Sequence, residues 1–142
     1  MKGFRKGISM SELNERNAAP ENTESGKDRS AALAKIAIQV LEDKKGEDIR
    51  VIDISDLSVL ADYFIIATGN NRTQVQAMAD EVEQKLGRAG AVPRQIEGYQ
   101  AANWVLLDFG DVIIHIFDAQ NRLFYDLERI WKDGRQIDPE GL

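Results

Sequence analysis

Hydrophobic residues recur along the chain with two spacings that predict its secondary structure. Leu33, Ile36, Ala37, Val40 and Leu41 follow the i, i+3, i+4, i+7, i+8 spacing that places side chains on one face of an α-helix. Short β-branched and aromatic runs elsewhere are typical of strands. The expected order is helix 30–44, strand 49–54, strand 62–68, helix 72–89, strand 92–97, strand 104–109, strand 112–117 and helix 123–131.

This order of elements predicts an α/β (α+β) domain. Because strands and helices interleave, we expect one mixed sheet of about five strands with helices packed on it. The run 62–68 is apolar on both faces, which favours a central strand. Pro93 lacks an amide donor, which favours an edge position for strand 92–97. Helix 72–89 is expected to connect two parallel strands.

The first 29 residues follow neither spacing. They contain few large apolar side chains, so they cannot bury enough surface to offset the entropy lost on ordering. We therefore expect residues 1–29 to be a disordered tail. Residues 30–142 are expected to form a single domain, of the size that one hydrophobic core commonly supports.

The predicted hairpin 104–117 has two unlike faces. With Gly110-Asp111 as a two-residue loop, Phe109 pairs with Val112 and the register follows along both strands. One face is purely apolar and should lie beneath the helices: Val105, Leu107, Phe109, Val112, Ile114 and Ile116. The other face mixes aromatic, aliphatic and charged groups: Trp104, Leu106, Asp108, Ile113, His115 and Phe117.

The residue pattern leaves two interpretations of this mixed face open. Aromatic side chains with a few charged groups around them are typical of protein-binding hot spots, which favours an exposed docking surface. Alternatively, a helix covers this face too, with Asp108 and His115 at its rim. Tyr125, at the start of the last predicted helix, is expected to reach the surface beside the hairpin.

Charge and composition narrow the possible partners. The chain has 18 Lys and Arg against 24 Asp and Glu, a formal net charge of −6, which disfavours nucleic acid as the main contact. It has no cysteine, which excludes disulfides, thiolate metal sites and a cysteine nucleophile. The longest uninterrupted apolar run is residues 63–67, against the roughly 18 residues that span a bilayer. We expect a cytoplasmic protein with no membrane contact.

Residue patterns of common enzymes are not found. His115 is the only histidine, and no serine lies in a Gly-x-Ser-x-Gly turn, which disfavours a serine triad. The turn 68–71 lacks a phosphate-binding glycine pattern and a lysine, so we interpret it as a helix cap. Asp53, Asp56 and Asp62 fit no standard metal loop. We expect no catalytic residue, no cofactor and no metal site.

Several longer motifs, taken together and in order, resemble the ribosomal silencing factor (RsfS, Iojap-like) family. The resemblance covers about residues 31–138 and leaves out the tail. The motifs are Asp62-Tyr-Phe-Ile-Ile-Ala-Thr-Gly69, Glu97-Gly98, the whole hairpin 104–117, Arg122-Leu-Phe-Tyr-Asp-Leu-Glu128 and Trp131.

The resemblance implies a fold similar to the nucleotidyltransferase core without the catalytic motifs of that class. It implies binding to the large ribosomal subunit, chiefly through ribosomal protein L-fourteen, which prevents the small subunit from joining and represses translation. It favours the exposed docking surface, and a free chain could form a homodimer through it. A nucleotidyltransferase-like enzyme, active or degenerate, or an adaptor for another protein stays the alternative. The expected partner-binding residues are Trp104, Leu106, Asp108, His115, Phe117 and Tyr125.

Overall fold

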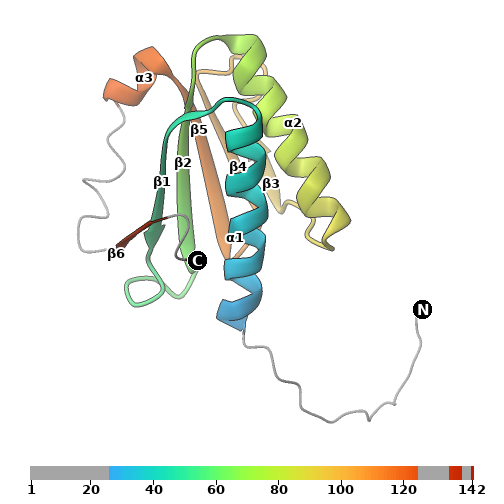
Figure 1. Ribbon diagram of the computed structural model, residues 1–142, viewed down its shortest axis with the longest axis vertical. Helices are drawn as coiled ribbons and strands as arrows, with labels where there is room; N and C mark the ends of the chain where they lie inside the picture. Colours follow the sequence, from blue (N-terminus) through green and yellow to red (C-terminus); the bar gives the residue numbers. More distant parts are fainter. Residues whose placement is uncertain (1–25, 125–134, 139–141) are drawn as a thin grey trace.

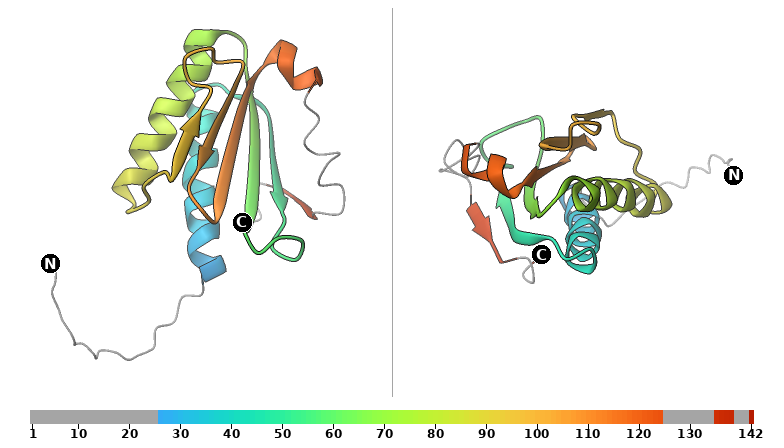
Figure 2. Two further views of the ribbon diagram at one scale, coloured as in Figure 1. Left: turned by 180° about the vertical axis from the view of Figure 1, so that it is seen from behind. Right: turned by 90° about the horizontal axis from the view of Figure 1, so that it is seen from above.

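The computed structural model describes residues 26–124, 135–138 and 142. Two long helices, α1 (Gly26–Asp43) and α2 (Arg72–Arg88), lie side by side on one face of a mixed sheet (Figures 1 and 2). A short helix, α3 (Ala119–Phe124), follows the last central strand. The strands are β1 (Glu47–Asp53), β2 (Tyr63–Gly69), β3 (Gln95–Glu97), β4 (Trp104–Asp108), β5 (Val112–Asp118) and β6 (Arg135–Ile137).

The sheet has the order β3-β4-β5-β2-β1-β6, and this mixed topology confirms the predicted fold class. Only β2 and β5 pair in parallel; the other neighbours are antiparallel. All seven residues of β2 are buried, as expected of a central strand, and β3 lies at the edge, as Pro93 predicted. The chain runs from β2 through α2 to β3, which is parallel to β2 but lies beyond β5 and β4.

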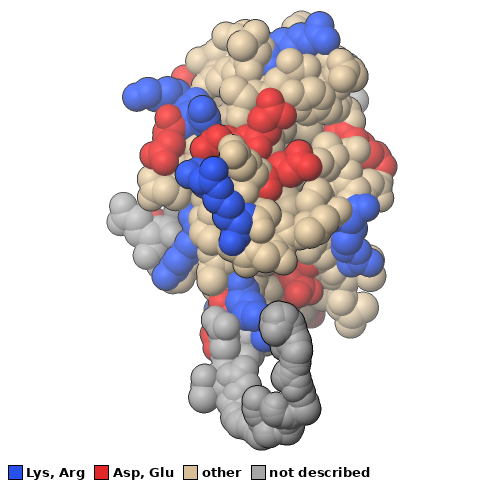
Figure 3. All heavy atoms as spheres, turned by 90° about the vertical axis from the view of Figure 1, so that its right-hand side faces the viewer, with Lys and Arg blue, Asp and Glu red and all other residues tan. Residues whose placement is uncertain are grey.

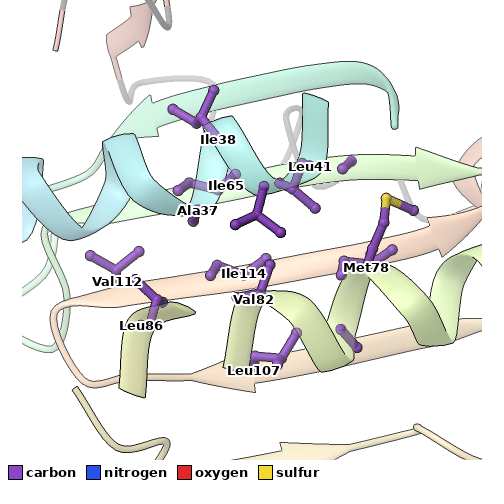
Figure 4. Close-up of a cluster of buried hydrophobic side chains, with 14 of the residues drawn as sticks. Ala37, Ile38, Leu41, Ile65, Met78, Val82, Leu86, Leu107, Val112 and Ile114 are labelled. Carbon is purple, nitrogen blue, oxygen red and sulfur yellow. The ribbon is translucent and has the colours of Figure 1, made fainter. Parts of the chain in front are cut away.

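The main core lies between the helices and the apolar face of the hairpin. Figure 4 shows side chains of α1 and α2 meeting those of the central strands, with Val82 and Leu86 over Ile114 and Val112. All six residues predicted for that hairpin face are buried. The predicted register is also confirmed, since Trp104 pairs with Phe117 and the amide of Phe109 donates to the carbonyl of Val112 over 3.0 Å.

The turn before α2 is the helix cap that the sequence predicted. The Asn71 side chain accepts a hydrogen bond from the amide of Gln74 over 2.8 Å. The Gln74 side chain in turn donates to the carbonyls of Lys44 and Lys45, both over 3.0 Å, and accepts from the amide of Asn70. One side chain therefore links the start of α2 to the turn that follows α1.

Several element boundaries differ from the predictions. Helix α1 begins at Gly26, so residues 26–29 are helical rather than part of the tail; residues 1–25 lie outside the described part of the chain. The Ser30 hydroxyl points inward and donates to the Gly26 carbonyl and to Asp62. The last predicted helix overlaps α3 only at residues 123–124, and residues 125–131 are not described. The sixth strand, β6, was not predicted.

No helix among the described residues could span a membrane, because none combines the length and the apolar character that a bilayer span requires.

Candidate partner-binding face

The sheet face opposite α1 and α2 carries a second, smaller apolar cluster. Its buried members are Ile52, Ile54, Ala61, Phe64, Ile66 and Phe117, with Trp104 and Ile113 packed against them and partly exposed. Helix α3 contacts β5 and β2 at one end of this face (Figure 2). The second face is therefore partly covered. It is neither the fully exposed docking surface nor the helix-covered face that the sequence left open as interpretations.

The expectation that His115 and Phe117 are open to a partner is wrong. Phe117 is 0% exposed and His115 is 4% exposed. Both lie on β5, which is flanked by β4 and β2, and the rings of Trp104 and Phe64 pack against them. Alternation along a strand places residues on a face, but it does not reveal which neighbours cover them.

The accessible part of this face lies on β4 and at its borders. Trp104, Leu106 and Asp108 are half-buried, and so is Ile113 on β5. Tyr125, the remaining predicted contact, lies outside the described residues. We call Trp104, Leu106 and Asp108 the β4 strip.

Two residues that were not among the expected partner contacts extend the β4 strip onto β3. Gln95 pairs with Asp108 and Glu97 pairs with Leu106, and direct antiparallel partners share a face. Both side chains are exposed, and the Gln95 amide donates to the Glu97 carboxylate. The apolar–polar alternation of β3 was visible, but the connection 98–103 is too long to fix its register from the sequence.

Buried His115 holds the indole of Trp104 in place. The Trp104 Nε1–H donates to His115 Nδ1 over 3.0 Å, and the Trp104 ring stacks on Phe117 with centroids 5.2 Å apart. Because Nδ1 accepts, the imidazole is neutral and carries its proton on Nε2. Burial lowers the pKa of His115 to about 4, which keeps this neutral form in place at physiological pH.

The geometry makes His115 a residue that positions Trp104, and it leaves the indole of Trp104 as the candidate contact. The ring of Phe64 packs against the imidazole with centroids 4.9 Å apart, so the imidazole cannot turn freely. An indole that is fixed by a hydrogen bond and a stacked ring loses little rotamer entropy when a partner docks on it. Such a preorganised aromatic side chain is typical of a binding hot spot.

The outer surface of the helices has a different character. Figure 3 shows the side of the molecule on which α2 lies, where acidic and basic side chains stand next to one another. Mixed charge of this kind is typical of a solvated helix surface. The β4 strip, with aromatic and aliphatic side chains bordered by carboxylates, is the better candidate for a docking site.

The three aspartates considered as metal ligands do not form a metal site. The Asp53 carboxylate accepts hydrogen bonds from Lys27 Nζ over 2.8 Å, Ser55 Oγ over 2.6 Å and Arg135 Nη2 over 2.7 Å. Burial alone would raise the pKa of Asp53, but these donors outweigh it and hold the pKa well below its usual range. Asp62 accepts from the Ser30 hydroxyl instead. Within the described ranges, no three His, Asp or Glu side chains gather as metal ligands would.

Known proteins match the chain over nearly all of its folded part. The family model described as "Ribosomal silencing factor during starvation" matches residues 27–142. The ribosomal silencing factor RsfS of Bacillus subtilis is 40% identical over 107 residues, which cover 75% of this chain and 91% of that protein. The chain belongs to the ribosomal silencing factor family. The expected resemblance is thereby confirmed.

Further members of the ribosomal silencing factor family support the fold as well as the sequence match. The RsfS of Halalkalibacterium halodurans is 37% identical over 110 residues, covering 78% of this chain and 94% of that protein. A crystal structure of a Chromobacterium violaceum protein superposes with a TM-score of 0.70 at 40% identity, covering 75% of this chain and 88% of that one. A crystal structure of a Bacillus halodurans protein superposes with a TM-score of 0.68 at 34% identity, covering 75% of this chain and 97% of that one.

Proposed function

We propose that this protein silences ribosomes by binding the large ribosomal subunit through ribosomal protein L-fourteen, so that the small subunit cannot dock. The observation that carries the proposal is the fixed, half-exposed Trp104 on a strip of the sheet that α1 and α2 leave uncovered. Membership in a family described as silencing ribosomes during starvation supports the same function.

The charges of the strip favour a basic protein as the direct partner. Asp108 and Glu97 border the apolar side chains, and the whole chain has a formal net charge of −6. Such a surface is repelled by ribosomal RNA phosphates but is complementary to the lysines and arginines of a ribosomal protein. Trp104 and Leu106 supply the apolar contact, and the carboxylates favour the correct partner.

The mechanism is steric, and it makes and breaks no covalent bond. A subunit whose docking surface is occupied cannot accept the second subunit, so inhibition follows the fraction of large subunits that carry the factor. By mass action, silencing 90% of them requires free factor at about nine times Kd. Neither a nucleotide nor a metal ion takes part in this step.

Co-sedimentation with isolated subunits tests the proposal directly. The protein should pellet with large subunits and remain in the supernatant with small ones. Trp104→Ala should weaken large-subunit binding at least about 30-fold, because truncating a hot-spot aromatic side chain typically costs about 2 kcal/mol or more. The matched control is Val92→Ala, which truncates an exposed side chain in the α2–β3 connection.

Two results would contradict the proposal. One is Trp104→Ala that stays folded by circular dichroism and binds large subunits as tightly as the unchanged protein. The other is equal binding to both subunits or to neither, which would favour an adaptor for a different partner.

A further inference from the structure

A second apolar feature lies in the loop between β1 and β2. The described part of the chain exposes four large aliphatic side chains, and three of them lie here: Leu57 at 45%, Val59 at 102% and Leu60 at 76%. We call residues 57–60 the tip loop; Figure 1 shows it at the end of the sheet where β1 ends and β2 begins. Exposing adjacent aliphatic side chains to water is unfavourable in the isolated chain, and such exposure is typical of an interaction site.

The tip loop is held in a defined shape by its own hydrogen bonds. The amide of Ile54 donates to the carbonyl of Asp62 over 2.8 Å and closes the base of the loop. The amides of Leu57 and Ser58 both donate to the Ile54 carbonyl over 2.9 Å, and the amide of Leu60 donates to the Ser58 hydroxyl over 3.0 Å. A loop that is already ordered loses little conformational entropy on binding.

The base of the loop belongs to the same side of the sheet as the β4 strip. Ile54 and Ala61, on either side of the loop, are both buried in the second apolar cluster against which Trp104 packs. The amide of Asp62 also donates to the carbonyl of Asp111 in the β4–β5 turn over 2.8 Å. The strip therefore runs from Trp104 at one end of β4, over about 13 Å of strand, to the end that borders the loop.

Contact area gives a physical reason for joining the two features. A stable protein–protein interface takes about 800 Å² from each partner. Trp104 and Leu106 are half-buried within the molecule and can give only part of their surface. Val59 is fully exposed and Leu60 nearly so, and they lie beyond the far end of the same face.

The charges around the tip loop match those around the β4 strip. Lys27 and Arg135 at this end of the sheet both bind Asp53, so part of their charge is already offset. Arg94 and Arg29 lie beside the β4–β5 turn. The carboxylates at the border of the loop are Asp56, Asp62 and Asp111. An apolar tip with this acidic border suits a basic protein surface and is repelled by RNA and by anionic lipid.

We propose that the tip loop is a second contact of the partner-binding face, and that Val59 and Leu60 insert into an apolar recess bordered by lysines or arginines on the same basic protein that Trp104 contacts. The inference rests on the proposed function and names a further part of the same binding surface. The partner would thus be held at both ends of the face.

The test is a Val59→Ser, Leu60→Ser double variant of the full chain, measured for binding to isolated large subunits. Both side chains are mostly exposed in the free protein, so the melting temperature should stay close to that of the unchanged protein. Affinity should fall about tenfold or more, because the partner then loses the burial of two aliphatic side chains. Val92→Ser is the matched control: Val92 is 77% exposed in the α2–β3 connection, and this variant should bind normally.

Trp104→Ala is measured in parallel so that the two proposals can be told apart. If Trp104→Ala weakens binding and the double variant does not, the tip loop is no contact and the proposed function stands. If the unchanged protein fails to bind large subunits, both proposals fall. If the double variant only reduces self-association in analytical ultracentrifugation, with subunit binding intact, the occupant is a second copy of this chain and the inference is overturned.

Discussion

His115 supports the proposed binding surface from beneath without being exposed on it. It is buried, and its Nδ1 holds the indole that we expect a partner to contact. The sequence placed His115 and Trp104 on one face correctly, because hairpin register follows from the turn. It could not show that Phe64 packs against the imidazole, because Phe64 lies on β2, far away from the hairpin in the chain.

His115→Phe tests this positioning role. The ring is replaced by one of similar size with no acceptor, so the indole N–H loses its partner. A neutral hydrogen bond contributes about 1 kcal/mol, so we expect His115→Phe to lower the large-subunit affinity about fivefold. His115→Gln keeps an acceptor and should lower this affinity less. In a Trp131→Phe background the remaining indole should also show lower fluorescence anisotropy in His115→Phe. Unchanged affinity and anisotropy would exclude a positioning role.

The buried imidazole also makes stability depend on pH. The pKa of His115 is lowered to about 4 from an ordinary value of 6.5, so between these values the unfolded chain is protonated there and the folded chain is not. Stability is therefore fully present above pH 6.5 and decreases as the pH falls towards 4, by on the order of 3 kcal/mol. Urea denaturation at pH 7 and at pH 4.5 measures the loss. His115→Gln should lose less over the same interval; an equal loss would assign the effect to other groups.

At the scale of elements, long patterned segments were predicted, whereas α3 was largely missed and β6 was missed entirely. The helices α1 and α2 and the strands β2, β4 and β5 each contain enough alternating positions to reveal a period. Strand β6 has three residues and α3 has six, too few for a period, although Asp118 caps α3 by accepting from the amide of Asn121 over 2.7 Å. Glu97 was not expected on the candidate face, because the connection 98–103 does not fix the register of β3 against β4.

Asp53 joins three elements, and its removal should loosen them together. Its carboxylate binds Lys27 of α1 and Arg135 of β6 from its place at the end of β1. Because both cations are partly exposed and regain water, we expect Asp53→Ala to lower the free energy of unfolding by about 2 kcal/mol rather than more. Urea denaturation measures the change, and hydrogen exchange should increase first in β6. Glu42→Ala, at an exposed position in α1, is the control and should change little.

At the scale of the whole molecule, the two faces of the sheet differ in what they carry. One face supports the main core with α1 and α2, and the other carries the small cluster, the β4 strip and the tip loop. The sequence could assign the first face because it is uniformly apolar. The second face is mixed, and its exposure had to be decided by the structure.

The acidic border of the face predicts a salt-dependent association. If carboxylates meet lysines and arginines of the partner, added salt should screen them and slow association. We expect large-subunit affinity to fall as monovalent salt rises at fixed Mg²⁺, and Asp108→Asn should reduce this dependence. Surface plasmon resonance over a range of salt concentrations measures both. An affinity that does not change with salt would mean that charge pairing contributes little.

The short edge strand β3 has a consequence for solubility. It offers only three residues of open backbone at the border of the sheet, it follows Pro93, and it carries exposed Gln95 and Glu97. A short, charged edge is a poor template for strand addition by another chain. The edge strand should therefore keep copies of this protein from adding to one another's sheets, even though the β4 strip and the tip loop expose apolar side chains.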